Sequence, residues 1–414
     1  MSNEGVHKGG VPGRDSGHPV LSRLISVEPD RFASNYWGKQ ALLSRAGELG
    51  GDFTDLLDSA SIDELVSQRG LRTPFLRVAK DGSTLPDKAF TGPGGVGAGI
   101  ADQVSDDKLV RLFADGSTLV LQALHRVWPP IIEFCQHLAA ELGHPVQANA
   151  YITPPQNQGF SNHYDVHDVF VLQVDGSKRW LIHPPVLEAP LRDQPWNDRK
   201  AAVQARSADN SLIEAVLEPG DCLYLPRGFL HAAKALGGVS THLTIGVHPW
   251  TRFAVAEQVL HQASQALKQD ASMRRSLPIG VDFNEWETLR PDLELIRRSL
   301  ISAVENANLG AIFDTLRRSG REAQRAAPIG PLRQLRDADS IDDATMIKLR
   351  RHLAASLDHV GGSSVVRSRA ADFALREEDV APMKGLLESG TASAADLGLD
   401  LARRLLLAGL ATVG

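Results

Sequence analysis

The sequence predicts an α+β protein in which a small antiparallel barrel or double-sheet jelly roll is flanked by helices. Between about residues 147 and 247, short segments rich in Val, Ile, Leu and aromatic residues are separated by Gly and Pro, a pattern typical of β-strands. Residues 21–146 and 251–320 instead repeat apolar residues at the spacing of amphipathic helices. Inside the strand region, Asp175-Gly176 lies between two extended arms, which predicts a hairpin turn there.

The length and charge of the chain limit its organisation and its partners. With 414 residues it exceeds the size at which one hydrophobic core stops growing, so two or three domains are expected. The composition, 43% hydrophobic and 23% charged, is that of an ordinary globular protein. A net charge of -6 disfavours general binding of phosphate backbones, so we expect no specific nucleic-acid binding.

Neither a secretory signal nor a membrane span is predicted. The first 20 residues are rich in Gly, Pro and polar residues and lack an apolar core, so they read as a flexible tail. No run of about 18 apolar residues occurs, and we expect a cytoplasmic protein, or a nuclear one if the cell has a nucleus. Cys135 and Cys222 lie in apolar runs and are interpreted as buried small hydrophobic residues.

The flanking regions carry further helix and loop signals. One helix is expected to begin at Pro129 and to end at Gly143. Near the C-terminus we expect a linker at about 326–333, then a helix, a strand-like stretch and two more helices, the order of a winged-helix module; these cover 341–358, 365–376, 383–390 and 399–410. The glycine-rich stretch 92–99 is interpreted as a flexible loop or lid, because no hydrophobic strand precedes it as a phosphate loop requires.

The residues that carry chemistry are two histidines and an aspartate. On a strand, residues two apart point to the same face, so His163 and Asp165 are expected to project side by side. His231 follows a Pro-Arg-Gly turn 66 residues after Asp165 (231 − 165). Two histidines and one carboxylate occupy one face of an octahedral metal and leave positions for a cosubstrate and oxygen, as in non-haem iron(II) oxygenases. Zinc hydrolases can use the same residue types, but they favour tetrahedral sites.

Other histidines are not assigned as ligands. His167 shares the predicted strand face, but a fourth protein ligand would close a site that oxygen needs, so we place it in a substrate pocket or behind the ligands. His183, His242 and His248 are interpreted as ordinary core or surface histidines.

A cation and two polar side chains are candidates for binding a dicarboxylate cosubstrate. Lys178, just after the predicted hairpin turn, can supply a positive charge for a distal carboxylate. Asn149 and Tyr151 lie two apart on the preceding predicted strand and can add hydrogen bonds. Considered without the neighbouring motifs, Lys178 is expected to be an ordinary, exposed hairpin lysine.

These motifs together resemble a known family. The segment NAYITPPQNQGFSNHYDVHDVFVLQVDGSKRWLIHPP, followed by LEPGDCLYLPRGFLHAA and preceded by DGSTLVLQALHRVWPP, is similar to the cupin-like JmjC proteins called ribosomal oxygenases. The resemblance is good over about 21–250 and looser over 251–414. It implies a double-stranded β-helix of the jelly-roll or cupin type, a JmjC catalytic domain over 21–250, a helical dimerisation region over 251–326 and a winged-helix-like domain over 327–414.

The resemblance also implies an activity. Iron(II) would be bound by His163, Asp165 and His231, and the cosubstrate 2-oxoglutarate by Asn149, Tyr151 and Lys178. With O2, such enzymes hydroxylate a side chain of a ribosomal protein, histidine in some members and arginine in others, and a homodimer is expected. Alternatives are the same chemistry on a small molecule or peptide natural product, histone demethylation, and a non-catalytic cupin-like scaffold. A DNA-binding regulator is disfavoured by 11 Lys/Arg and 12 Asp/Glu in residues 328–414.

Overall fold

The computed structural model describes residues 17–80, 82–155, 157 and 161–414. By its internal contacts the chain divides into two compact units, Met1–His248 and Pro249–Gly414, and each is described by itself. Most of the tail expected over residues 1–20 lies outside the described residues. None of the helices in the described ranges has both the length and the apolar character needed to cross a bilayer.

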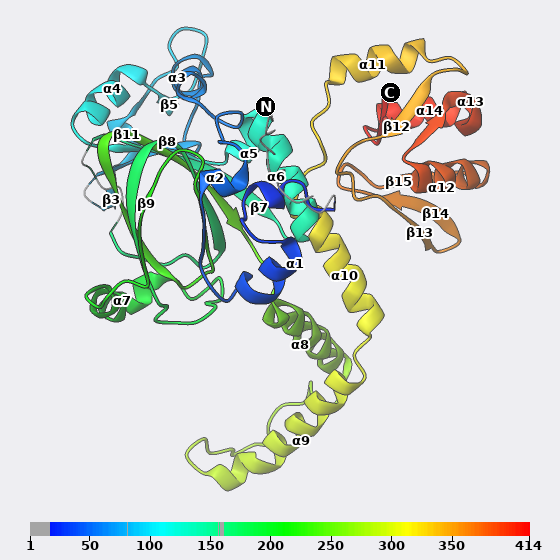
Figure 1. Cartoon of the computed structure of the whole chain (residues 1–414). Helices are drawn as coiled ribbons and strands as arrows, with labels where there is room; N and C mark the ends of the chain where they lie inside the picture. The colour runs from blue at the N-terminus through cyan, green and yellow to red at the C-terminus, as the bar shows by residue number, and fades with distance from the viewer. Residues whose placement is uncertain (1–16, 81, 156, 158–160) are drawn as a thin grey trace, which may run out of the picture. The chain divides into compact units, whose positions relative to one another are not determined.

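A curved antiparallel sheet forms the centre of the first unit (Figure 1). Among the described residues it has nine strands in the order β1-β10-β8-β11-β7-β6-β2-β3, and β9 also pairs with β8. The strands are β1 (Leu42–Ser44), β2 (Leu76–Lys80), β3 (Ser83–Thr84), β6 (Thr118–Leu121), β7 (Val146–Thr153), β8 (Asp168–His183), β9 (Ile213–Leu217), β10 (Cys222–Leu225) and β11 (Leu230–Val247).

Two long strands, β8 and β11, organise this sheet. They pair with each other along nearly their whole length. Residues Val169–Leu172 of β8 also pair with β10, whereas Lys178–Ile182 pair with β9. The second half of β11 pairs with β7. Since β8 changes its outer partner midway, the sheet has two sections that share β8 and β11, as expected for a double-sheet fold of the cupin type.

The hairpin predicted at Asp175-Gly176 is wrong, because β8 continues through both residues as one strand. Opposite them, the register of β11 shifts between Leu236 and Thr241, where β11 has extra residues. Gly176 has φ +60°, and a Cβ atom there would overlap the carbonyl oxygen of Val239. Glycine thus lets β8 bend against a bulge in its partner without leaving the sheet.

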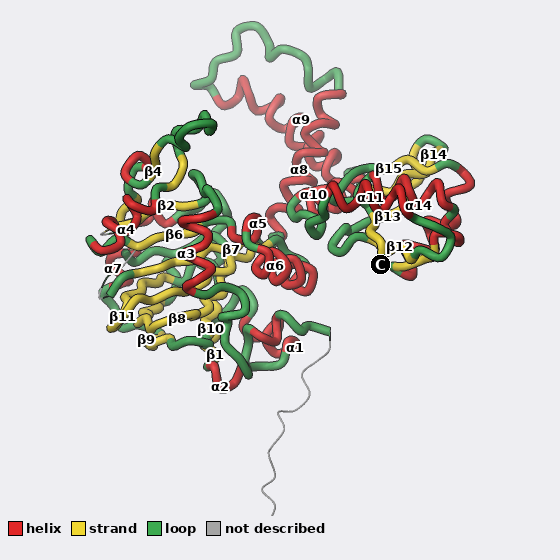
Figure 2. Tube along the Cα trace, turned by 90° about the horizontal axis from the view of Figure 1, so that it is seen from above, coloured by secondary structure: helices red, strands yellow, loops and turns green. Residues whose placement is uncertain are grey.

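Helices cover the sheet of the first unit and complete its core (Figure 2). They are α1 (Pro29–Arg31), α2 (Ala46–Leu49), α3 (Ser59–Gln68), α4 (Asp106–Ala114), α5 (Leu124–Val127), α6 (Pro129–Leu142) and α7 (Lys200–Ser207). Both α5 and α6 contact β7. As predicted, α6 has Pro129 at its start and ends at Gly143 in a left-handed conformation. Cys135 and Cys222 are buried, and burial raises the pKa of both thiols.

The glycine-rich stretch 92–99 lies in the connection between two very short paired strands, β4 (Thr91–Gly92) and β5 (Gln103–Val104). Several of its residues are exposed, Val96 among them. The strand before it, β4, has only two residues, and the second of them, Gly92, already belongs to the stretch. The hydrophobic strand that a phosphate loop requires is therefore missing from these described residues.

The second unit begins with three helices, α8 (Arg252–Gln269), α9 (Trp286–Glu305) and α10 (Leu309–Glu322). A compact C-terminal module follows, with its own buried core of aliphatic residues. Its elements are α11 (Pro331–Ser340), β12 (Met346–Leu349), β13 (Ser356–Val360), β14 (Ser363–Arg367), β15 (Phe373–Leu375), α12 (Val380–Ser389), β16 (Thr391–Ser393), α13 (Ala394–Leu397), α14 (Leu399–Leu407) and β17 (Ala411–Val413).

One expectation for this module is wrong. The helix predicted over 341–358 is replaced by β12 and β13, because β12 pairs with β16 and β17, and positive φ angles at His352 and Ala354 interrupt the chain between the two strands. Where a linker was expected at about 326–333, the chain has neither helix nor strand over residues 325–330, between α10 and α11. Ala326 and Ala327 are buried against the module, and α11 already begins at Pro331.

We predict that Gly176→Ala lowers the free energy of unfolding by at least about 2 kcal/mol, because a left-handed conformation is costly for alanine and the added Cβ overlaps Val239. Gly237→Ala is a matched control: Gly237 also has positive φ, but open space surrounds it, so a loss of only about 1 kcal/mol is expected. Denaturant unfolding of the full chain measures both. Equal losses would show that the close approach to Val239 is unimportant.

Candidate functional site

The centre of the site is held by a backbone bridge between two segments far apart in the sequence. His163 and His231 pair as an isolated antiparallel bridge, with the His231 amide donating to the His163 carbonyl at 2.8 Å and the reverse bond at 3.3 Å. The Gly228 amide donates to the Asp165 carbonyl at 3.0 Å. His163 and Asp165 lie just before β8 and not on a regular strand as predicted, whereas His231 is the second residue of β11.

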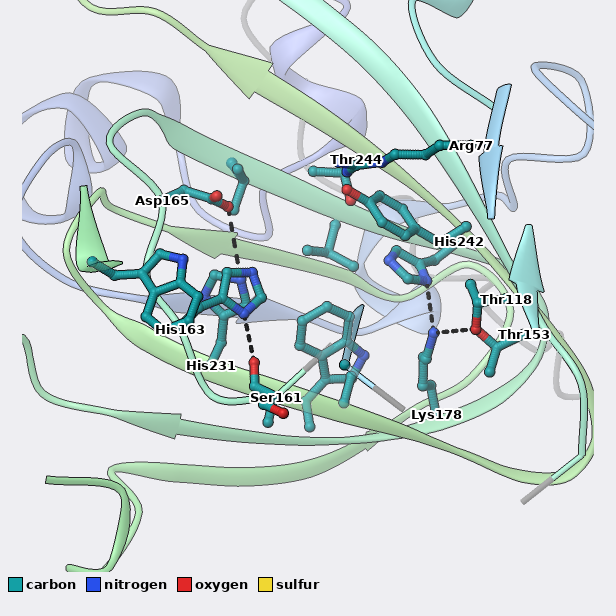
Figure 3. Close-up of a pocket in the computed structure, with 18 of the residues that line it drawn as sticks. Arg77, Thr118, Thr153, Ser161, His163, Asp165, Lys178, His231, His242 and Thr244 are labelled. Atoms are coloured by element: carbon teal, nitrogen blue, oxygen red, sulfur yellow. Dashed lines mark hydrogen bonds and ion pairs between the residues drawn. The ribbon is translucent and has the colours of Figure 1, made fainter. Parts of the chain in front are cut away.

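These three side chains converge (Figure 3). One potential ligand atom from each of His163, Asp165 and His231 lies within 4.8 Å of the other two, and His231 Nε2 is 3.7 Å from Asp165 Oδ2. The carbonyl of Ser161 lies 2.8 Å from His163 Nδ1, and that of Phe229 lies 3.1 Å from His231 Nδ1. Carbonyls only accept, so both rings donate through Nδ1 and keep the Nε2 lone pair for a metal.

The protonation states suit metal binding as well. Burial, with repulsion from His163, lowers the pKa of His231 to about 4, so this ring is neutral near pH 7. Burial alone would raise the pKa of Asp165, but the neighbouring imidazoles of His167, His231 and His163 lower it more strongly. The set therefore offers a neutral imidazole and a carboxylate at neutral pH, the forms that bind a divalent cation.

A cavity of about 400 Å³ adjoins these side chains, and Lys178 lies on its wall. Lys178 is only 3% exposed, although a hairpin lysine would be exposed. Its Nζ donates to Thr153 Oγ1 at 2.9 Å and lies 3.4 Å from His242 Nδ1. Burial lowers the pKa of Lys178 to about 7. The cavity thus places a buried amine across from the histidine and aspartate cluster, which suits an anionic ligand that spans the two.

Of the two polar residues expected beside Lys178, one lines the cavity. Tyr151 does so and stacks on His242, with ring centroids 4.9 Å apart and planes 2° from parallel. Asn149 is not among the lining residues. Its Oδ1 accepts a hydrogen bond from the backbone amide of Ala123 at 3.0 Å, so it holds the turn before α5.

The structure also reveals cavity residues that sequence reasoning missed. His242 was interpreted as an ordinary histidine, but it lines the cavity because it is the cross-strand partner of Tyr151. The pairing of these two strands could have identified His242, because it places His242 opposite Tyr151. Thr244, two residues further along β11, has its side chain on the same face and also lines the cavity. Arg77 on β2 is a second cation in the wall, close enough to Asp165 and Tyr151 to affect their pKa values. No local pattern in the sequence linked Arg77 to this site.

The remaining histidines lie elsewhere. His167 is not among the cavity-lining residues. Its ring approaches His248 edge-on, with centroids 5.0 Å apart, and its Nε2 is 3.3 Å from Gln147 Nε2. His167 is therefore close enough to Asp165 to lower the pKa of that carboxyl, but it does not line the cavity. His183 is buried at the end of β8.

Known proteins are similar to this chain in sequence. Residues 126–254 match the JmjC domain family. Ribosomal oxygenase 1 of Gallus gallus is 30% identical over 66% of this chain and 46% of its own length. The bifunctional lysine-specific demethylase and histidyl-hydroxylase NO66 of Drosophila persimilis is 29% identical over 70% of this chain and 41% of its own. The chain thus spans less than half the length of these relatives.

Solved structures agree with the fold. The Escherichia coli protein ycfD superposes with a TM-score of 0.54 at 15% identity, over 94% of this chain and 99% of that protein. The ribosomal oxygenase YcfD in complex with cobalt and 2-oxoglutarate gives a TM-score of 0.53 at 15% identity, with the same coverage.

We predict that Lys178→Met stabilises the ligand-free protein in a pH-dependent way. Between the folded pKa of about 7 and the ordinary value of 10.5, the unfolded chain binds more protons at Lys178 than the folded chain does, so the burial cost is full below about pH 7 and fades toward about pH 10.5. The gain should be on the order of a few kcal/mol at pH 6.5 and nearly absent at pH 10.

Urea unfolding at several pH values measures this gain. Lys234→Met, on the exposed side of β11, is the matched control and should change stability equally at every pH. A pH-independent effect of Lys178→Met would contradict a buried, charge-bearing amine.

Proposed function

We propose that this chain, a member of the JmjC ribosomal-oxygenase family, is an iron(II)- and 2-oxoglutarate-dependent oxygenase that hydroxylates a protein side chain. One observation carries the proposal: the His163, Asp165 and His231 cluster shares a cavity with the buried amine of Lys178. The His163, Asp165 and His231 cluster alone would be compatible with many metal-dependent hydrolases, and a buried lysine alone would be compatible with binding of any anion. Their combination suits a cosubstrate that reaches a metal at one end and a cation at the other.

In this proposal, His163, Asp165 and His231 bind the iron. Two neutral imidazoles and one carboxylate are the ligand set that leaves three adjacent positions of an octahedral ion open. The hydrogen bonds from each Nδ1 to a backbone carbonyl orient the rings and select the coordinating nitrogen. When bound, iron(II) with 2-oxoglutarate and O2 supplies the oxidising chemistry. The protein's part is to hold the ligands, position the target and limit access of water.

Lys178 and Tyr151 are assigned to the distal carboxylate of 2-oxoglutarate. The amine of Lys178 already donates to Thr153 Oγ1, and Thr118 Oγ1 donates to the same hydroxyl at 3.3 Å. A carboxylate there would receive charge-assisted hydrogen bonds in a site shielded from water. It would also favour the charged amine, whose pKa is low only while the cavity lacks an anion. We assign Asn149 a supporting part, since its amide oxygen holds Ala123 in place beside β7.

We assign the target to a histidine or arginine of a ribosomal protein. The names of the relatives, ribosomal oxygenase and histidyl-hydroxylase, support this class and make histidine the first candidate. Trp196 and Asn197 line the cavity beside His163, with the Trp196 and His163 rings 6.4 Å apart. An aromatic wall beside the metal ligands suits a flat target side chain such as imidazole or guanidinium.

The test is succinate formation from 2-oxoglutarate by iron(II)-loaded protein, with and without a ribosomal-protein extract. We expect the extract to stimulate turnover, and mass spectrometry to find one residue that has gained one oxygen. His163→Ala and Asp165→Ala should lose turnover by at least about 100-fold, whereas His137→Ala, on the exposed face of α6, should be unaffected.

The other outcomes discriminate among functions. Iron binding without succinate under any condition would overturn the oxygenase in favour of a scaffold. Stimulation by small amines or free peptides, but not by the extract, would keep the chemistry and change the substrate. A normal requirement for 2-oxoglutarate in Lys178→Ala would remove that lysine from the cosubstrate site.

We further propose that α8–α10 form a homodimer interface and that residues 327–414 act as a winged-helix-like module for protein contacts. The twenty-residue helix α9 is amphipathic, yet none of its residues is buried. Many large apolar side chains of this region are exposed, including Phe253, Leu260, Phe283, Trp286, Leu293, Ile296, Leu300, Ile301 and Phe313. So many large apolar side chains exposed on neighbouring helices suit burial against a partner, and a second copy is the simplest one.

For the dimer, we predict a mass in solution of about twice 44.8 kDa by light scattering. Ile296→Glu with Leu300→Glu, on one face of α9, should give a folded monomer because it places charges in the apolar surface. Arg298→Glu, on the opposite face, is the control and should remain dimeric. A monomeric unaltered chain, or a dimer that tolerates both glutamates, would refute the assignment.

A further inference from the structure

Asp168, the first residue of β8, is a buried carboxylate that the site described above does not use. Its exposed fraction is 0%, and among the described residues those that line the cavity with Lys178 do not include it. A buried carboxylate is costly unless charges and hydrogen bonds compensate it. The groups that compensate Asp168 therefore indicate what its side chain holds in place.

Three donors reach this carboxylate from β10 and from the turn that follows β10. The Tyr224 hydroxyl donates to Asp168 Oδ2 at 2.8 Å. The backbone amide of Arg227 donates to Asp168 Oδ1 at 3.0 Å, and Arg227 Nη1 lies 3.4 Å from the same oxygen. Tyr224 is itself anchored, because its Oη accepts from the Gly38 amide at 2.8 Å. Asp168 thus ties the start of β8 to the turn over residues 226–229.

The turn and the start of β11 also contact the segment that carries the first two candidate ligands. His163 pairs with His231, and the Asp165 carbonyl accepts from the Gly228 amide at 3.0 Å. The contact of Asp168 with the turn extends this antiparallel series by one more step. The first two contacts join backbones, whereas the third depends on a side chain. It is therefore the contact that a substitution can remove.

The same turn orients the third candidate ligand. The Phe229 carbonyl accepts from His231 Nδ1 at 3.1 Å, which leaves Nε2 for the metal. The other side of the turn is closely packed, because a Cβ atom at Gly228 would lie 2.5 Å from the Leu187 carbonyl oxygen. A shift of the turn would move both the carbonyl that orients His231 and the amide that holds Asp165.

We propose that Asp168 is a positioning residue for the metal centre, a role that rests on the proposed function. Its carboxylate holds the turn in the conformation that brings His231 beside His163 and Asp165. A buried ion pair contributes little net stability compared with well-packed apolar residues of similar volume. The contact of Asp168 with Arg227 therefore serves a defined turn conformation, which metal affinity reports and stability alone does not.

The test is titration of the full chain with cobalt(II), followed by the visible absorption of the bound ion. Asp168→Asn keeps an oxygen that can accept from the Arg227 amide but loses the charge, whereas Asp168→Ala loses both. We expect cobalt(II) to bind about tenfold more weakly to the Asn variant and about 100-fold more weakly to the Ala variant. At saturating metal, both variants should show an altered absorption spectrum, because the three ligands converge less well.

Asp221→Asn and Asp221→Ala are the matched controls. Asp221 is 4% exposed and lies at the other end of β10, where it accepts from Arg45 Nη1 at 2.6 Å and from the Ala46 amide at 2.9 Å. These donors are of the same kind as those of Asp168, but they belong to the start of α2. We expect both controls to lose stability in denaturant unfolding and to keep the cobalt(II) affinity and spectrum of the unaltered chain.

Unchanged cobalt(II) affinity and spectrum in Asp168→Ala would overturn the inference. An equal loss of affinity in Asp221→Ala would do the same, because it would show a general effect of lost stability. Where Asp168→Ala does not fold, the milder Asp168→Asn decides by the same two readouts. Absence of cobalt(II) binding by the unaltered chain would overturn the ligand assignment together with this inference, whereas normal binding without oxygenase turnover would overturn only the proposed function.

Discussion

The antiparallel pairing of β8 with β11 is the constraint on which the rest of the first unit depends. It forms the shared spine of both sheet sections. Within this pairing His231 lies opposite Ile182 of β8, and its backbone also forms the isolated bridge with His163. The same pairing places Lys178 opposite Ala235 further along the two strands. His231 of the candidate metal cluster and the strand partner of the buried amine, Ala235, therefore lie four residues apart on β11 (235 − 231), and the register of the strand pair fixes their separation.

The cavity between the histidine and aspartate cluster and Lys178 brings several ionisable side chains close together. Lys178 and Arg77 bring two basic side chains to a wall that also contains Asp165. Burial of the amine is costly without an anion, and burial together with Lys178 holds the pKa of His242 well below its ordinary value. His242 therefore stays neutral and adds no further charge. The free site is thus destabilised in the manner expected of a preformed site for an anion.

Much of this site was predictable from the sequence, and the exceptions have physical reasons. His163, Asp165, His231 and Lys178 come together as expected, because the residue types and the Pro-Arg-Gly turn are local signals. Asp175-Gly176 misled because a hairpin turn and a bend against a bulge make the same local demand, a positive φ angle. Only the facing strand distinguishes them. The helix expected over 341–358 failed for a similar reason, since pairing with β16 and β17 overrides local helix propensity.

Long-range contacts account for the residues that the sequence did not identify. His242 and Arg77 carry no motif, and they reach the cavity through strand neighbours, Tyr151 for the first and β6 for the second. Asn149, in contrast, was predicted to line the site but does not line the cavity. It has the expected place on β7, but the nearby Ala123 amide occupies its side-chain oxygen. Strand alternation predicts which face a side chain takes, whereas the partner it meets there depends on the neighbouring strands.

The backbone bridge between His163 and His231 also has a consequence for how the protein matures. Because 66 residues separate Asp165 from His231, a nascent chain that has emerged only as far as β10 possesses two of the three proposed ligands and lacks the strand that carries the third. With the proposed ligand set, tight capture of a metal would wait until β11 has paired with β8, and metal loading would be a late event of folding. Partly synthesised chains would hold iron only weakly, which keeps a redox-active ion away from unfinished protein.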